Sequence, residues 1–90
     1  MNFIHSQNRI FLLNDNNETI AEVTFPDIDP NTVDINHTYV SDSIRGHGIA
    51  GKLMKAAAEQ LQAQNKKAVL TCSFAIKWFE RNPEYNNLLK

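Results

Sequence analysis

The sequence predicts an α/β domain with a mixed sheet, in which antiparallel N-terminal strands precede a strand-helix-strand crossover. Residues 9–40 contain short segments of alternating apolar and polar residues, residues 49–64 carry a helical stripe, and residues 68–72 are a short apolar run. A chain of 90 residues with 42% hydrophobic and 21% charged residues suits one small core. We therefore expect residues 1–90 to form a single domain.

The first predicted strands form a hairpin. Residues 9–13 are β-like, and residues 14–17 are a turn because their short polar side chains bond to their own backbone. Residues 20–25 alternate between apolar and polar side chains, which predicts a half-covered strand. Pro26 and Pro30 bracket the next turn.

Residues 32–40 alternate again and predict the first strand of the crossover. On this pattern Val33, Ile35, His37 and Tyr39 share one face of that strand. The helix that follows has an apolar stripe at spacings of three and four residues. The stripe consists of Ile49, Leu53, Ala56, Ala57 and Leu61.

The second strand of the crossover is the apolar run of residues 68–72, which is typical of a strand covered on both faces. A connection of this length and type is right-handed and joins parallel strands. Residues 74–80 predict a short helix that Asn82-Pro83 ends, because the residue before proline disfavours helical geometry. The last residues, through Leu89, form another short helix or a strand.

Charge and composition exclude several classes of partner. The net charge is −1 and the nine Lys and Arg residues are scattered, so the chain lacks the basic field that grips a nucleic acid. Its one cysteine cannot form an internal disulfide, and no segment approaches the roughly 20 apolar residues of a membrane span. We expect a cytoplasmic protein with no metal, no nucleic-acid partner and no membrane partner.

The most informative segment is a glycine loop, Arg45-Gly46-His47-Gly48, between the predicted strand and the long helix. The first amides of a helix lack intrahelical acceptors, and the helix dipole favours an anion there. Gly46 and Gly48 let the backbone approach phosphate oxygens, Arg45 adds a charge-assisted contact, and Gly51 lets the helix sit close to the sheet. The loop therefore predicts a diphosphate site. The alternative is a tight turn that binds nothing.

Two ligands fit a glycine loop of this kind, and the surrounding sequence separates them. Gly46-x-Gly48-x-x-Gly51 matches the dinucleotide fingerprint, which requires an acidic residue about 20 positions further on. The chain has Thr71-Cys72-Ser73 there and is too short for two mononucleotide halves. A dinucleotide site is therefore disfavoured.

In a second frame, Arg45-x-x-Gly48-x-Ala50 resembles the acyl-coenzyme A loop of the GCN5-related N-acetyltransferase (GNAT) superfamily. The likeness extends to His37-Thr38-Tyr39-Val40 and Cys72-Ser73-Phe74, and over nearly the whole chain it is similar to compact GNAT-like acetyltransferases. This resemblance implies a GNAT-like fold whose central parallel strands splay apart for acyl-CoA. It implies acetyl-CoA or CoA as the ligand and an amine as the acceptor.

The resemblance also implies which residues form the site. Cys72 is the suspected nucleophile, although a free cysteine is often only a small buried residue. His37 suits a general base, although it equally suits a structural hydrogen bond, and its distance from Cys72 depends on the strand register. The cofactor-binding residues that the resemblance and the glycine loop imply are Thr38, Tyr39, Val40, Arg45, Gly46, His47, Gly48, Ile49, Ala50 and Gly51.

Two functions remain open on the sequence. The first is acetyl transfer to an amine, by direct attack or through acetyl-Cys72. The second is a CoA-binding module with little or no turnover. Larger relatives place helices where this chain has only residues 14–19, so we expect an acceptor groove that is open or completed by another subunit. We expect a monomer or a weak homodimer.

Overall fold

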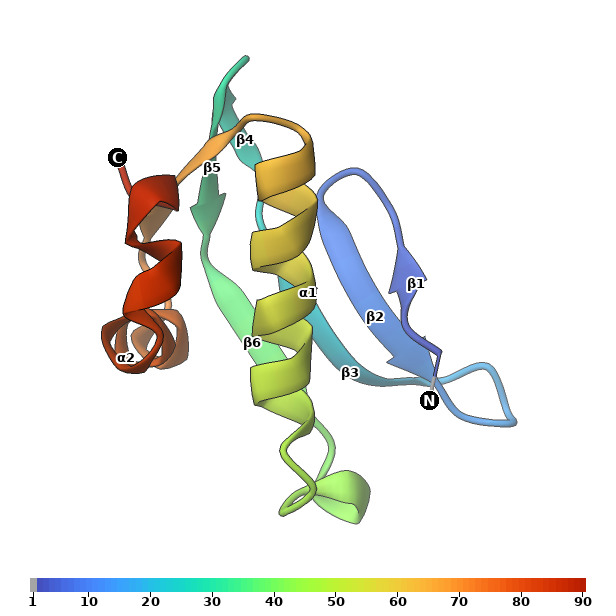
Figure 1. The fold of residues 1–90 in the computed structure, drawn as a ribbon. Helices are drawn as coiled ribbons and strands as arrows, with labels where there is room; N and C mark the ends of the chain where they lie inside the picture. Colours follow the sequence, from blue (N-terminus) through green and yellow to red (C-terminus); the bar gives the residue numbers. More distant parts are fainter. Residues whose placement is uncertain (1) are drawn as a thin grey trace.

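Figure 1 shows the computed structural model, which describes residues 2–90. One sheet has the strand order β1-β2-β3-β6 and the other has the order β4-β5-β7. Only the β5–β7 pair is parallel among these strands. The elements are β1 (Ile4–His5), β2 (Arg9–Leu13), β3 (Thr19–Thr24), β4 (Asp27–Asp29), β5 (Thr32–Ile35), β6 (His37–Val40), η1 (Asp42–Ile44), α1 (Ile49–Ala63), β7 (Lys67–Leu70), α2 (Ser73–Arg81) and η2 (Pro83–Leu88). The mixed architecture and the right order of elements confirm the predicted fold class.

The predicted hairpin is present as β2 and β3. The two strands are antiparallel, with Arg9 opposite Thr24. Between them the Asn14 side chain accepts hydrogen bonds from the amides of Asn16 and Glu18, at 2.9 and 3.0 Å. The polar turn therefore closes the hairpin through its own side chains, as the sequence predicted.

The prediction of one strand over residues 32–40 was wrong, because the segment divides at Asn36 between the two sheets. The Asn36 amide donates to the Thr24 carbonyl at 3.2 Å, and its side-chain oxygen accepts from the Thr24 hydroxyl at 2.6 Å. Asn36 belongs to neither ladder, so the alternation of inward-facing and outward-facing side chains shifts by one position beyond it. Ile35 is fully buried, whereas His37 and Tyr39 are exposed.

The long helix and the crossover are confirmed. Figure 1 shows α1 lying across one face of β2, β3 and β6, with α2 beside it. Strands β5 and β7 are parallel, with Ile35 opposite Leu70. The helix buries Ile49, Leu53, Met54, Ala57, Ala58 and Leu61.

The second crossover strand ends two residues earlier than predicted. The amides of Thr71 and Cys72 both donate to the Ile35 carbonyl, at 3.1 and 3.2 Å, and the chain turns there into α2. The predicted short helix is confirmed as α2, and Asn82 ends it. Phe79 of α2 and Leu88 of η2 are buried and complete the hydrophobic core. None of the helices in residues 2–90 is long and apolar enough to cross a bilayer.

Candidate functional site

The first component of the site is a strand edge that has no partner. Strand β6 pairs only with β3, because the parallel ladder of the other sheet ends at Ile35 and Leu70. The Ser41 amide donates to the Ile20 carbonyl of β3 at 2.7 Å. Since amides alternate in direction along an antiparallel strand, those of Thr38 and Val40 point the other way, into the gap beside β6.

The second component is the glycine loop at the start of α1. Gly46 and Gly48 adopt φ of 88° and 70°, in the left-handed region that favours glycine. Gly48 is the N-cap of α1, and its carbonyl accepts from the Lys52 amide at 3.1 Å. The amides of Ile49, Ala50 and Gly51 thus have no intrahelical acceptor. This is the arrangement of donors that an anion needs.

A cavity of about 460 Å³ joins these two components. It opens between the glycine loop and the start of α2, and its lining is mainly apolar. The lining residues are Val40, Ile44, Arg45, Gly46, Gly48, Ile49, Ala50, Gly51 and Phe74. Seven of the ten predicted cofactor-binding residues thus surround one cavity.

Arg45 is turned back onto its own loop. One guanidinium nitrogen lies 2.9 Å from the Asp42 carboxylate, and Nε donates to the Val40 carbonyl at 3.2 Å. The side chain is 67% exposed, so it can exchange these partners for an anion at low cost. Its contact with phosphate stays a prediction.

The packing partner predicted for Gly51 was wrong. An added Cβ at this position would lie 3.7 Å from Nε1 of Trp78, on α2. Gly51 therefore faces the neighbouring helix and not the sheet. The sequence did not indicate this, because the position of α2 depends on where β7 ends.

Cys72 and Thr38 are brought together. Cys72 is the N-cap of α2, half-buried, and its Sγ lies 3.5 Å from the Thr38 hydroxyl oxygen. Thr38 lies opposite the buried Val23 in the β3–β6 ladder, so it projects toward the core side of β6. The thiol thus lies beside the free edge of that strand.

His37, Tyr39 and His47 lie apart from this group. His37 and Tyr39 project to the outer face of β6, opposite to Thr38, because successive side chains alternate along a strand. Nε2 of His37 lies 3.5 Å from a carboxylate oxygen of Glu22, and the His37 side chain is 53% exposed. The Tyr39 amide points toward β3 on the same alternation. His47 is an exposed loop residue that does not line the cavity.

Two lining residues were not among those predicted. Ile44 belongs to η1, and Phe74, which is 36% exposed, faces the loop from α2. Phe74 is part of the Cys72-Ser73-Phe74 motif, which could have identified it. Ile44 has no comparable signal in the sequence.

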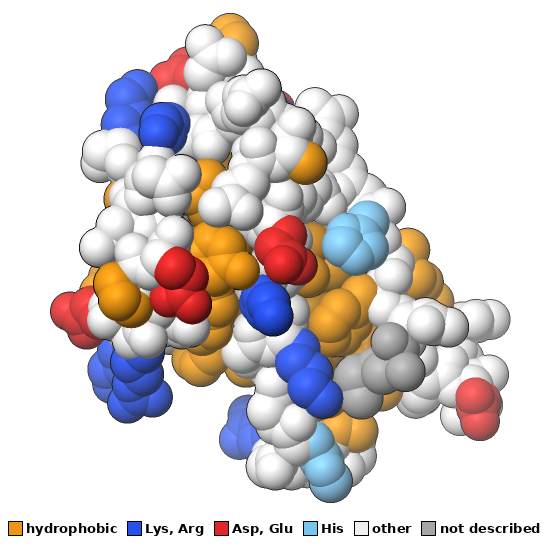
Figure 2. All heavy atoms as spheres, viewed as in Figure 1, with side chains coloured by type: hydrophobic (Ala, Val, Ile, Leu, Met, Phe, Trp, Pro, Cys, Tyr) orange, Lys and Arg blue, Asp and Glu red, His pale blue; other side chains and the backbone are white. Residues whose placement is uncertain are grey.

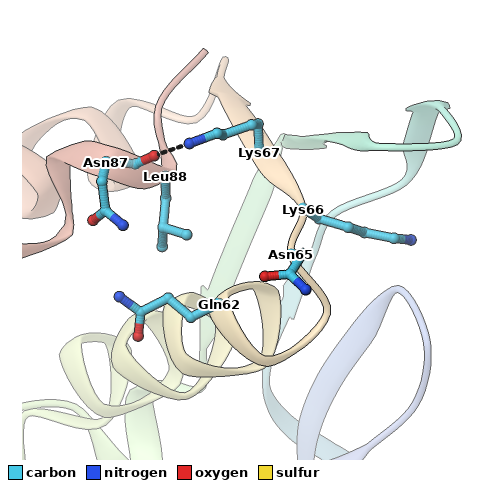
Figure 3. Close-up of a pocket in the computed structure, with 6 residues that line it drawn as sticks. All are labelled: Gln62, Asn65, Lys66, Lys67, Asn87 and Leu88. Carbon is cyan, nitrogen blue, oxygen red and sulfur yellow. Dashed lines mark hydrogen bonds between the residues drawn. The ribbon is translucent and has the colours of Figure 1, made fainter.

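A second cleft, of about 350 Å³, lies at the other end of α1 (Figure 3). Both of its lysines have partners: Nζ of Lys67 donates to the carbonyl of Asn87, which lines the same cleft, and Lys66 points away and lies 3.1 Å from Asp27. The hydrogen bond from Lys66 is the main cause that lowers the pKa of Asp27. This cleft therefore offers an anion no free lysine among the residues described.

Figure 2 shows acidic and basic side chains interspersed over the face that carries α1. Lys and Arg do not merge there into one broad patch. This distribution agrees with the net charge of −1. Binding at the glycine loop therefore depends on local donors and not on a long-range positive field.

Comparison with known proteins gives consistent matches. A family model described as GCN5-related N-acetyl-transferase matches residues 9–88. Protein NATD1 of Xenopus tropicalis is 46% identical over 52 residues, which are 58% of this chain and 48% of that protein. The chain thus spans about half the length of the curated relatives it matches.

Two solved structures extend the comparison to the fold. A GCN5-like protein from Staphylococcus aureus, solved by NMR, has a TM-score of 0.80 and 32% identity, over 99% of this chain and 87% of that one. The crystal structure of Tetrahymena GCN5 has a TM-score of 0.65 and 20% identity, over 81% of this chain and 48% of that one. The second likeness concerns the fold alone.

Proposed function

Because the chain belongs to the GCN5-related N-acetyltransferase family, we propose that it transfers an acetyl group from acetyl-CoA to an amine. The observation that carries this proposal is the cavity that joins the unpaired amides at the start of α1 to the free edge of β6. Its volume of about 460 Å³ suits a small-molecule site, with an apolar wall and a few fixed polar groups.

Each end of the cavity has its own role in this proposal. The amides from Gly46 to Ala50 hold the diphosphate, with Arg45 as an additional donor. Val40, Ile44 and Phe74 provide the apolar wall for the pantetheine arm. Acetyl-CoA supplies the activated thioester. The Val40 amide, at the free edge of β6, donates to the carbonyl oxygen where charge develops.

The acetyl group can reach the amine by two routes. In the first, the amine attacks the thioester carbonyl carbon directly, the bond to the CoA sulfur breaks, and CoA leaves as the thiol with the proton that the amine loses. In the second, Sγ of Cys72 attacks the carbonyl carbon, the bond to the CoA sulfur breaks, and the amine then takes the acetyl group from Cys72. The position of Cys72 at the N-terminus of α2 supports the second route. His37 acts as a base only for an acceptor that approaches from the outer face of β6.

Intact mass after incubation with acetyl-CoA separates these routes. Retention of one acetyl group that is lost in Cys72→Ser, and kept in His37→Ala, supports the thiol route. Acetylated amines without any protein adduct support direct attack. Calorimetry with acetyl-CoA and NAD tests the ligand itself, and tighter binding of NAD would contradict the proposal.

One observation favours the alternative of a CoA-binding module with little turnover. The outer face of β6 has no helix over it in the described chain, and Tyr39 is 41% exposed there. These residues thus form no enclosed groove for an acceptor. If acetyl-CoA binds but no amine in a broad panel is acetylated, the module is the correct function.

A further inference from the structure

Within residues 2–90, one side-chain hydrogen bond crosses the gap between β6 and α2. The parallel ladder between β5 and β7 ends at Ile35 and Leu70, and β6 continues without a strand partner on that side. Across the gap, the Thr38 hydroxyl oxygen lies 3.5 Å from Sγ of Cys72. Both side chains are half-buried, so water competes only partly for this contact.

The backbone of Cys72 is held independently of this contact. Its amide donates to the Ile35 carbonyl at 3.2 Å, and its carbonyl accepts from the Ile76 amide at 3.1 Å. The thiol makes no capping hydrogen bond to α2. Within residues 2–90, the Thr38 hydroxyl is the only hydrogen-bond partner of Sγ. Thr38 is thus the one described polar group that can orient the thiol, which otherwise packs against the core.

The pair lies next to the proposed acyl-CoA cavity. Val40 and Phe74 are each two residues beyond a member of the pair, and both line the cavity. A thiol held by Thr38 is therefore placed where the cavity meets the gap between β6 and α2. A thiol released from Thr38 can rotate away from it.

We propose that Thr38 is a positioning residue for Cys72. Its hydroxyl donates a hydrogen bond to the thiolate and so fixes the direction of Sγ. The inference rests on the proposed function only in that the thiol is used during acetyl transfer. The hydrogen bond itself needs no ligand.

Other charged groups on the packed elements are accounted for. Strand β5 carries Asp34, whose carboxylate accepts the Thr71 hydroxyl at 2.7 Å. Strand β6 carries His37 on its opposite face, and α2 carries the exposed Lys77, Glu80 and Arg81. A Thr38→Val substitution leaves all of these in place, so its effect on Cys72 reports on the lost hydroxyl.

The test is the pH dependence of Cys72 alkylation by iodoacetamide, without acetyl-CoA. In Thr38→Val alkylation at neutral pH is expected to be several-fold slower, because the thiolate loses its one hydrogen-bond donor among the described residues. Thr38→Ser restores the wild-type profile. Thr71→Val is the matched control, because it removes a neighbouring hydroxyl that bonds to Asp34 and not to Cys72.

The outcomes decide the matter. An unchanged profile in Thr38→Val, or equally slow alkylation in Thr71→Val, overturns the positioning role. If Thr38→Val does not fold, as judged by its melting curve, Thr38→Ala is measured in its place. Calorimetry of the wild type with acetyl-CoA is a separate readout: slower alkylation in Thr38→Val without binding keeps the role of Thr38 and refutes the proposed function.

Discussion

At the C-terminal end of α1 the chain satisfies its own backbone groups, whereas at the N-terminal end it leaves them facing a cavity. Beyond Ala63, the Lys66 amide donates to the Leu61 carbonyl at 3.0 Å, and the Asn65 amide to the Gln62 carbonyl at 3.2 Å. Asn65 adopts a φ of 57° to make this possible. At the N-terminal end, Gly48 caps the helix without a side chain, and no acidic residue lies in the first turn.

This difference separates a structural end from a binding end. Both ends border a cleft, and both have basic side chains nearby. At the structural end Lys66 is paired with Asp27, and Lys67 with the Asn87 carbonyl. At the binding end the backbone donors remain available to a ligand. Backbone groups that are left without partners indicate a functional site more strongly than the presence of a cleft does.

The largest effect is expected from a charge placed at the binding end. Gly48→Glu adds a carboxylate beside the predicted diphosphate and strains a left-handed position, so acetyl-CoA affinity should fall by roughly 100-fold or more. Calorimetry measures this affinity for acetyl-CoA. Gln62→Glu adds the same charge beside the other cleft and should leave affinity unchanged. Equal losses in the two variants would contradict the distinction between the ends.

A smaller effect is expected from Arg45. Arg45→Ala removes one charge-assisted contact and the link to Val40, so acetyl-CoA affinity should fall about tenfold. Asp42→Asn frees Arg45 from its carboxylate partner and should tighten binding about twofold. Lys66→Ala is the reference at the other end, with no expected change in affinity. A tenfold loss there would mean that net charge alone drives binding.

Alanine should have opposite effects on stability at the two ends. Gly51→Ala is expected to stabilise the fold by about 0.5–1 kcal/mol, because alanine favours the helix and its methyl would contact Trp78 at an ordinary distance. Asn65→Ala is expected to cost about 1 kcal/mol, because alanine tolerates the left-handed region poorly. Urea unfolding measures both. A destabilised Gly51→Ala would show that α2 lies closer to α1 than described.

The same comparison explains which features could be predicted from the sequence. The hairpin, α1 and the parallel crossover follow local periods and turn residues, so they were predictable. The division at Asn36 was not, because it depends on a hydrogen bond to Thr24 on another strand. The partner of Gly51 and the contact between Thr38 and Cys72 likewise depend on where β7 ends, which the apolar run of residues 68–72 did not indicate.

The smallest predicted effect is that of acid on the stability contributed by the Asp27–Lys66 pair at the structural end of α1. The hydrogen bond from Lys66 lowers the pKa of Asp27 below its model-compound value of 3.8. Since the pKa is lower in the folded state, this pair stabilises the fold above that value and loses the contribution as the pH falls through the folded pKa. Melting temperatures of the wild type should therefore exceed those of Asp27→Asn slightly at neutral pH, and the difference should vanish in strong acid. Lys66→Ala should lose the same pH-dependent contribution to the melting temperature. A difference that persists unchanged in strong acid would contradict the role of the Asp27 charge, because the hydrogen bonds from Lys66 and Asn8 both lower its pKa and so both favour the carboxylate.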